Sequence, residues 1–223
     1  MTGWTEYAAA WGFFLATHAL PSRAAIRPRL VAALGTRGYT LAYSALSLTA
    51  LAWLIGAAGR APRLPLWPQP AGAAWLVLAA TIPAALLLAV SIARPNPFSF
   101  GGARNHLFDP DRPGIVRLTR HPVLLALLLW AIGHLAVNGD LAHALLFGGF
   151  AGFALLGMRM LDRRALRRKG AEEWRAEIAR LRAAPLRLPL GWTRLLSAAA
   201  GLLAVILLHR WLAGVSIWRN FLG

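Results

Sequence analysis

The chain has 223 residues, of which 58% are hydrophobic and 14% are charged, and its formal net charge is +16. Soluble domains carry about a quarter charged residues, so this composition excludes an ordinary soluble domain and indicates a membrane protein. The sequence contains no cysteine, which excludes disulfides, thiolate metal ligands and a cysteine nucleophile.

Long uncharged runs predict membrane-spanning helices, because a bilayer core needs about 20 apolar residues of helix. In chain order, the predicted spans cover about residues 6–26, 39–58, 71–93, 119–138, 141–161 and 195–212. The stretch 123–158 is too long for one crossing at about 1.5 Å per residue, so the "NGD" turn at 138–140 should divide it into a hairpin. The whole chain, 1–223, is thus predicted to be a single all-α, polytopic transmembrane domain.

The basic residues gather in alternate loops. The segments that follow the first, third and fifth predicted spans hold 20 lysines and arginines, and the rest of the chain holds 4. The positive-inside rule therefore predicts that these three segments are cytoplasmic and that both termini lie on the outer side. This distribution accounts for the high positive charge without a nucleic-acid partner.

An amphipathic segment follows the fifth predicted span. Between Asp162 and Ala184, four apolar residues recur at helical spacing among arginines: Leu166, Trp174, Ile178 and Leu181. This pattern predicts an interfacial helix on the cytoplasmic face, bound to the lipid bilayer and its anionic lipids.

Two histidines lie deep in predicted spans. His18 is about 14 Å along a helix from Arg27, and His134 is about 20 Å from His121. An ionisable group at such depth indicates function, and two imidazoles on different spans are the axial ligands that a haem iron takes. The alternative is that each histidine is hydrogen-bonded to a neighbouring helix, whereas zinc or non-haem iron would need more ligands. Solvated or interfacial positions are predicted for the other membrane-flanking histidines, His106, His143 and His209.

A second cluster of polar residues precedes the fourth span in "GIVRLTRHP". Arg117, Arg120 and His121 gather at the start of a helix, where bunched donors favour an anionic group such as a lipid headgroup. The alternative is a basic anchor at the membrane surface. Further on, Arg159 and Asp162 are three residues apart, which predicts an ion pair along one helical face.

The segments "FFLATHALPS", "GIVRLTRHPVLLALLLWAIGHLAVNGD" and "GMRMLDRR" resemble the NnrU family of bacterial membrane proteins and the related zeta-carotene isomerases. The resemblance covers nearly the whole chain in the same order. It implies a bacterial inner-membrane protein with periplasmic termini, linked to denitrification through production of nitrite and nitric oxide reductases. It also implies haem b held by His18 and His134, and isomerase-like chemistry on a hydrophobic small molecule. Ala131 stands where the isomerases have a cysteine, so a thiolate step is excluded.

Three functions follow from these observations. The first is a haem-b membrane protein of denitrification, isomerase-like in its chemistry. A more distant resemblance of the "RHP" segment to isoprenylcysteine and phospholipid methyltransferases implies the second, an S-adenosylmethionine-dependent methyltransferase with Arg120 and His121 on the carboxylate of that cofactor. The third is a non-catalytic maturation factor for respiratory reductases. Haem absorbance separates the first from the second.

Overall fold

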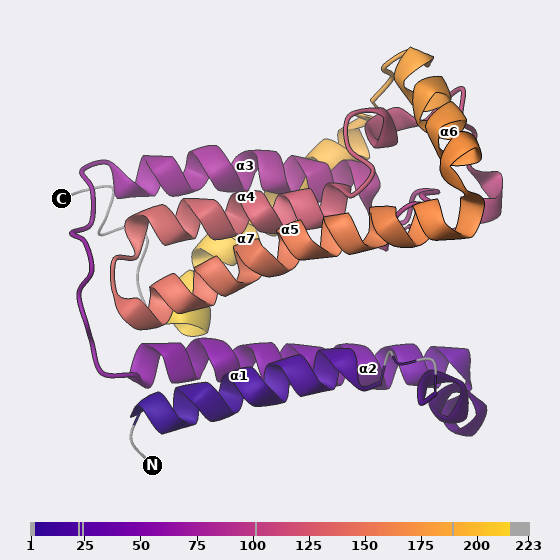
Figure 1. Ribbon diagram of the computed structural model, residues 1–223. Coiled ribbons are helices and arrows are strands. Elements are labelled where there is room, and N and C mark those ends of the chain that lie inside the picture. The colour runs from indigo at the N-terminus through magenta and orange to yellow at the C-terminus, as the bar shows by residue number, and fades with distance from the viewer. Residues whose placement is uncertain (1–2, 22, 24, 101, 189, 215–223) are drawn as a thin grey trace.

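The computed structural model describes residues 3–21, 23, 25–100, 102–188 and 190–214, and over these residues the chain is all-helical, with no strand (Figure 1). Its α-helices are α1 (Gly3–Ala19), α2 (Arg27–Arg60), α3 (Ala73–Ser91), α4 (Pro122–Val137), α5 (Leu141–Lys169), α6 (Ala171–Ala183) and α7 (Trp192–Ala213). Two short 3₁₀ helices, η1 (Asn105–Leu107) and η2 (Gly114–Arg117), lie between α3 and α4.

Four of the described helices are long and apolar enough to cross a membrane: α2, α3, α5 and α7. The prediction of a helical membrane protein agrees with this finding, but the prediction of six spans is not confirmed. α4 is apolar but has 16 residues, which is about 24 Å of helix against a bilayer core of about 30 Å. α1 has 17 residues and is similarly short.

Prolines set the limits of the two shorter helices. The first predicted span ran on to residue 26, whereas α1 ends at Ala19, just before Pro21. The fourth was predicted to begin at residue 119, whereas α4 begins at Pro122. The residue before a proline is displaced from the helical region, and His121 accordingly has φ −122° and ψ 58°.

The turn between α4 and α5 matches the predicted hairpin. α4 ends at Val137, and Asp140 is the N-cap of α5. The Asp140 carboxylate accepts a hydrogen bond from the backbone N–H of His143 at 3.3 Å, which satisfies one of the free donors of the first helical turn. The hairpin therefore aligns α5 antiparallel to α4, and this alignment positions the site described below.

The predicted interfacial helix is interrupted and faces protein. α5 continues to Lys169, and Gly170, with φ 84°, separates it from α6. The left-handed φ explains the glycine at this break. The apolar side of α6 packs on a buried cluster that includes Phe98 and Val116, and it contributes Leu181, Trp174 and Ile178 to it. α6 therefore covers the loops between α3 and α4 with the side chains that were predicted to meet lipid.

The helices form two groups (Figure 1). α4 packs between α3 and α5, α7 packs on α3, and α1 pairs with α2. Small residues allow the close contacts, as is common between membrane helices: a Cβ on Gly133 would lie 2.5 Å from the Cβ of Ala80. The main core lies between α1, α2, α4 and α5, and its largest side chains include Phe14, Leu54 and Phe150.

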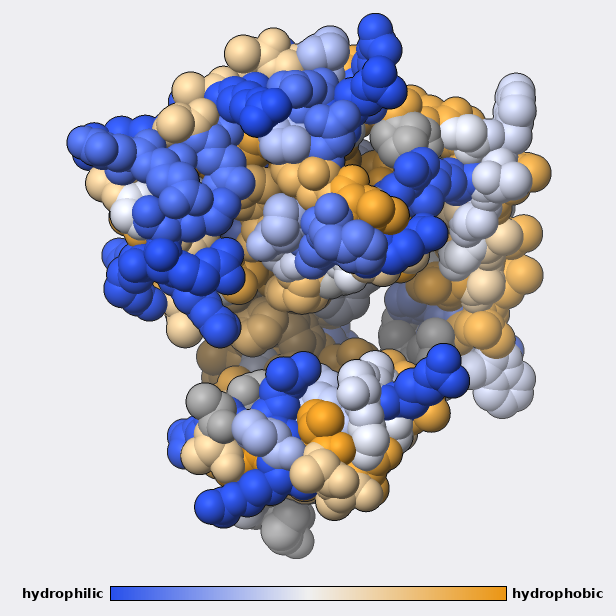
Figure 2. All heavy atoms as spheres, turned by 90° about the vertical axis from the view of Figure 1, so that its right-hand side faces the viewer, coloured by the Kyte–Doolittle hydropathy of each residue, from blue (hydrophilic) through white to orange (hydrophobic). Residues whose placement is uncertain are grey.

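Hydrophilic side chains gather at one end of the bundle, where Figure 2 shows them over both helix groups. This end, here called the basic end, holds the α1–α2 connection, the α3–α4 loop and α6 (Figure 1). The three basic segments thus share one side, as the positive-inside argument requires. α7 exposes Trp192 and Trp211 at its two ends, at 80% and 85%, and exposed tryptophans at helix ends are typical of membrane–water interfaces.

Candidate functional site

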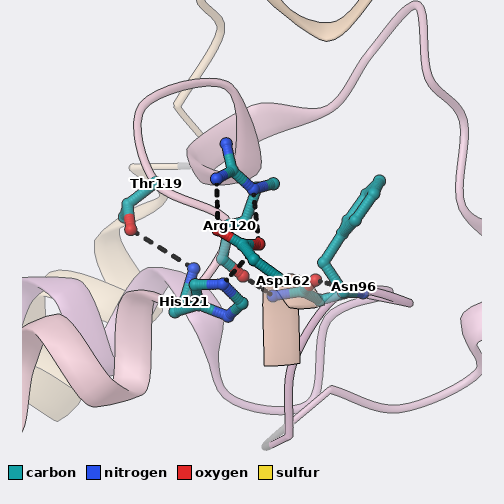
Figure 3. A network of polar contacts seen from close by, with 6 residues as sticks. Asn96, Thr119, Arg120, His121 and Asp162 are labelled. Carbon is teal, nitrogen blue, oxygen red and sulfur yellow. Dashed lines mark hydrogen bonds and ion pairs between the residues drawn. The ribbon is translucent and has the colours of Figure 1, made fainter. Parts of the chain in front are cut away.

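Two sequence motifs that are 41 to 42 residues apart meet at the basic end (Figure 3). Arg120 donates from Nε and Nη2 to the two carboxylate oxygens of Asp162, at 3.0 and 2.6 Å. The Nε2 of His121 lies 2.9 Å from Asp162 Oδ1. One carboxylate from α5 therefore binds two consecutive residues at the start of α4.

The hairpin explains why these residues meet. α4 and α5 leave the "NGD" turn antiparallel, so the end of α5 returns to the beginning of α4. A Cβ on Gly157 would lie 3.3 Å from Leu124, which places this turn of α5 beside the first turn of α4. Helical side chains lean toward the N-terminus of their helix, and this lean brings Asp162 back toward His121.

The protonation pattern of His121 follows from its partner. A carboxylate accepts, so Nε2 carries the hydrogen and, in the neutral ring, Nδ1 carries the lone pair. The side chain of His121 is 4% exposed, and its Nδ1 is buried with no hydrogen-bond partner among the described residues. This nitrogen can accept a hydrogen bond from a bound molecule, with Asp162 holding the ring in place.

Asn96 ties the site to the α3–α4 loop (Figure 3). Its side-chain amide donates to the backbone carbonyl of Arg120 at 3.0 Å, and its Oδ1 accepts from the N–H of Phe98 at 3.0 Å. The guanidinium of Arg120 also lies 5.5 Å from the ring centre of Trp174 on α6, a cation–π contact. Sequence reasoning missed Asn96, because an asparagine in a loop carries no signal of its burial.

The partner of Asp162 differs from the predicted one. Arg159 was expected to pair with Asp162 along the helix, but the carboxylate turns to Arg120 and His121 on α4. Asp162 is the only acidic residue between Asp140 and Glu172, and its isolation among arginines was the available signal. Of the three residues predicted to hold an anion, Arg120 and His121 thus already bind a carboxylate.

Arg117, the third residue of the predicted anion site, lies in η2. It does not share the carboxylate of Asp162, and its Nε is buried without a hydrogen-bond partner in the described part of the chain. The structure therefore brings Arg120 and His121 together on one carboxylate and leaves Arg117 outside that network.

The two histidines predicted as haem ligands have the same local geometry. The Nδ1 of His18 lies 2.8 Å from the carbonyl oxygen of Phe14, and the Nδ1 of His134 lies 2.8 Å from that of Trp130. A carbonyl only accepts, so each Nδ1 is the donor and each neutral ring carries its lone pair on Nε2. Metal-ligating histidines are commonly held by such a bond from the other ring nitrogen.

Aromatic side chains separate these two histidines. His18 packs on Phe14 at 4.1 Å between ring centres, and His134 packs on Trp130 at 4.7 Å. Phe150 contacts both Phe14 and Trp130, at 5.6 and 6.0 Å. The two histidines therefore border one aromatic cluster.

The direction of the helices offsets the two histidines along the bundle. α1 runs parallel to α5, because Tyr7 bonds the carbonyl of Ala142 at the start of α5 and Trp11 packs on Phe150 further along. α1 is therefore antiparallel to α4, and His18 and His134 depart from the level of Phe150 in opposite directions. One helical turn of four residues rises about 6 Å, so their Cα atoms are offset by about 12 Å.

In both histidines the backbone bond holds Nδ1, so Nε2 is the ring nitrogen through which each imidazole could coordinate an iron atom. The described residues also include no group of three or more His, Cys, Asp or Glu side chains that could hold a metal ion. Of the remaining histidines, His143 lies 2.5 Å from the N-cap carboxylate of Asp140, and His209 on α7 lies near His134.

Comparison with known proteins gives one match. A family model described as "NnrU protein" matches residues 7–217. Neither the curated proteins nor the solved structures gave a match. The matched range includes the membrane histidines and the Arg120–His121–Asp162 site.

Proposed function

Because the chain belongs to the NnrU family over residues 7–217, we propose that it is a haem-b-binding inner-membrane protein that serves denitrification. In this role it supports the production of nitrite and nitric oxide reductases. The basic end faces the cytoplasm and both termini face the periplasm, in accordance with the positive-inside rule. Anionic lipids neutralise the basic end, and any substrate is a hydrophobic small molecule that enters from the bilayer.

The observation that carries the proposal is the environment of His134. Its Nδ1 donates to the Trp130 carbonyl at 2.8 Å, and its ring lies 4.7 Å from Trp130 and 5.1 Å from Phe147. The backbone bond fixes the tautomer with its lone pair on Nε2, and the two aromatic rings hold the imidazole in an apolar surrounding that limits access of water. Haem b, when bound, supplies redox or small-ligand chemistry at its iron.

Two histidines are candidates for the second ligand. His18 has the matching tautomer, and its Cα is offset from that of His134 by about 12 Å along the bundle. His209 on α7 lies near His134 and is the alternative. Isomerase-like chemistry would have to proceed without a thiolate, because Ala131 is fully buried beside this region and the chain has no cysteine.

The methyltransferase alternative is disfavoured by one contact. It needs Arg120 and His121 to hold the carboxylate of S-adenosylmethionine, yet both bind Asp162. A cofactor carboxylate would have to displace this internal carboxylate from a bidentate arginine pair, which is among the stronger hydrogen-bonded arrangements in proteins.

An absorption spectrum of the purified full chain, made with ample haem supply, tests the proposal. We expect a haem spectrum that His134→Ala largely abolishes and that the surface control His143→Ala preserves. Loss of the low-spin form in His18→Ala identifies His18 as the second ligand, whereas loss in His209→Ala identifies His209. A colourless, folded wild-type protein would contradict the haem proposal.

The role in denitrification is tested in a denitrifying host that lacks the chain. We expect lower nitrite and nitric oxide reductase activity, restored by the wild-type chain and not by His134→Ala. Restoration by the haem-free His134→Ala protein would instead support the non-catalytic maturation factor. Unchanged reductase activity without the chain would contradict the role itself.

A further inference from the structure

A cavity of about 230 Å³ lies at the basic end, beside the Arg120–His121–Asp162 site and separate from the membrane histidines. Its lining comes from the end of α3, the α3–α4 loop and the segment after α6. Asn96 forms part of the wall and links the cavity to Arg120 through its side-chain bond to the Arg120 carbonyl. The end of α3 and the loop that follows it thus line one space together with the distant segment after α6.

The charged groups of the lining are mostly cationic. Arg94, Arg112 and Arg187 line the cavity, and Asp109 is the only acidic residue of the lining. None of the three arginines forms an ion pair with a described carboxylate. The neighbouring Asp111 is already neutralised by Arg180, whose guanidinium lies 2.6 Å from it and lowers the pKa of Asp111.

Apart from the amide of Asn96 and the hydroxyl of Ser91, the remaining side chains of the lining are apolar. Val90 and Val116 belong to the buried cluster under α6, and the Ser91 residue, 4% exposed, marks the end of the membrane helix α3. An anion in this cavity would therefore have cations around it and apolar side chains beneath it. The three arginines are themselves exposed to solvent, which screens each charge, so binding of an anion requires them to act together.

The size of the cavity limits the bound group. Drug-sized ligands occupy about 300–1,000 Å³, and a liquid water takes about 30 Å³, so 230 Å³ suits a phosphate with a few further atoms. Arginine is the side chain best suited to phosphate, because its planar donors bind two oxygens together. Three arginines can together bind all the terminal oxygens of a phosphate ester, which number three in a monoester and two in a diester.

We propose that the cavity formed by Arg94, Arg112 and Arg187 binds the phosphate group of a small phosphate ester at the membrane surface. A lipid headgroup such as phosphatidylglycerol and a soluble ester such as glycerol 3-phosphate share this chemistry. The site is independent of haem binding, so its failure and that of the haem proposal are distinguishable.

The test compares two triple variants of the full chain in nanodiscs of phosphatidylcholine. Arg94→Gln, Arg112→Gln and Arg187→Gln empties the cavity of cations. Arg163→Gln, Arg167→Gln and Arg168→Gln removes the same charge from exposed positions on α5 at the same end. Binding of glycerol 3-phosphate is measured by calorimetry, and retention of phosphatidylglycerol is measured by native mass spectrometry, both at constant ionic strength.

We expect the cavity variant to lose about tenfold or more in affinity or retention, which corresponds to about one charge-assisted hydrogen bond, and the control variant to change little. Binding of glycerol 3-phosphate by the wild type would indicate a soluble ligand, and retention of phosphatidylglycerol without such binding would indicate a headgroup. Equal loss in both variants, or no binding of either ligand by the wild type, would overturn the proposal. A Tm equal to that of the wild type would confirm that the cavity variant is folded.

Discussion

Replacing Asp162 by alanine should destabilise the protein more than any neighbouring surface change. The substitution removes the acceptor of three hydrogen bonds, two from Arg120 at 3.0 and 2.6 Å and one from His121 at 2.9 Å. Arg120 and Asp162 are 28% and 29% exposed, whereas His121 is 4% exposed. In the variant, water can therefore solvate the guanidinium of Arg120, but it cannot replace the hydrogen bond that the buried imidazole of His121 loses.

The magnitude follows from these exposures. A hydrogen bond to a charged group contributes about 1.5–3 kcal/mol, and a solvent-accessible ion pair about 0–1 kcal/mol. The bond to His121 takes the first value and the Arg120 pair the second, which gives a loss of about 1.5–4 kcal/mol. For a chain of this size, about 2–4 °C per kcal/mol converts this loss to a fall of about 3–16 °C in Tm.

Thermal unfolding in detergent, followed by far-ultraviolet circular dichroism, measures the effect. Arg159→Ala is the matched control, because Arg159 is on the same face of α5 and was the partner predicted from sequence. Arg120→Ala should cost less in the Asp162→Ala background than in the wild type, by about 0.5 kcal/mol or more, since contacting residues are coupled. The reasoning is refuted if Arg159→Ala costs as much as Asp162→Ala, or if Asp162→Ala leaves Tm unchanged.

Three further predictions concern topology, packing and pH. A reporter fused at the C-terminus should report the periplasm and one inserted into α6 the cytoplasm, and reversed signals would refute the positive-inside assignment. Gly149→Ala should lower Tm, because its Cβ would lie 2.6 Å from the Trp11 ring, whereas Gly148→Ala, with open space, should be neutral or stabilising. The pKa of Asp111 is lowered by its hydrogen bonds from Arg180, so their contact should persist above the ordinary carboxyl pKa and be lost as pH falls through the lowered value. Hydrogen exchange of the Asp111 loop should show this step, and Asp111→Asn should abolish it.

Several features of the protein could be predicted from sequence because they depend on local interactions. A helix satisfies its backbone hydrogen bonds within one segment, which is the requirement that a bilayer imposes, so uncharged runs were sufficient to predict an all-α membrane protein. The hairpin at 138–140 also followed from local chemistry, since Asp140 caps α5 and Asn138–Gly139 cannot easily continue α4. The gathering of arginines in alternate segments predicted which segments share the basic end.

Helix ends were predicted less well where a proline or glycine acts over one or two residues. Pro122 shortens α4 and Gly170 separates α6 from α5, so the predicted spans and the interfacial helix were too long. The sequence also did not show whether the apolar side of α6 packs on lipid or on protein, because Trp174 and Ile178 suit both surroundings equally. In the folded chain the α3–α4 loop lies beneath α6, and the apolar side of α6 packs on buried residues of this loop.

The partners of the polar residues were decided by tertiary structure alone. Asp162 is three residues from Arg159 in sequence, yet it binds Arg120 and His121, because the rotation of α5 about its axis points its carboxylate at α4. Rotation and axial register depend on close contacts such as Gly133 against Ala80, and no local pattern encodes them. The same register offsets His18 from His134 by about 12 Å. The sequence by itself thus determined that the chain is helical and which segments share the basic end. Helix packing decided which side chains meet, because packing brings together residues that are distant along the chain.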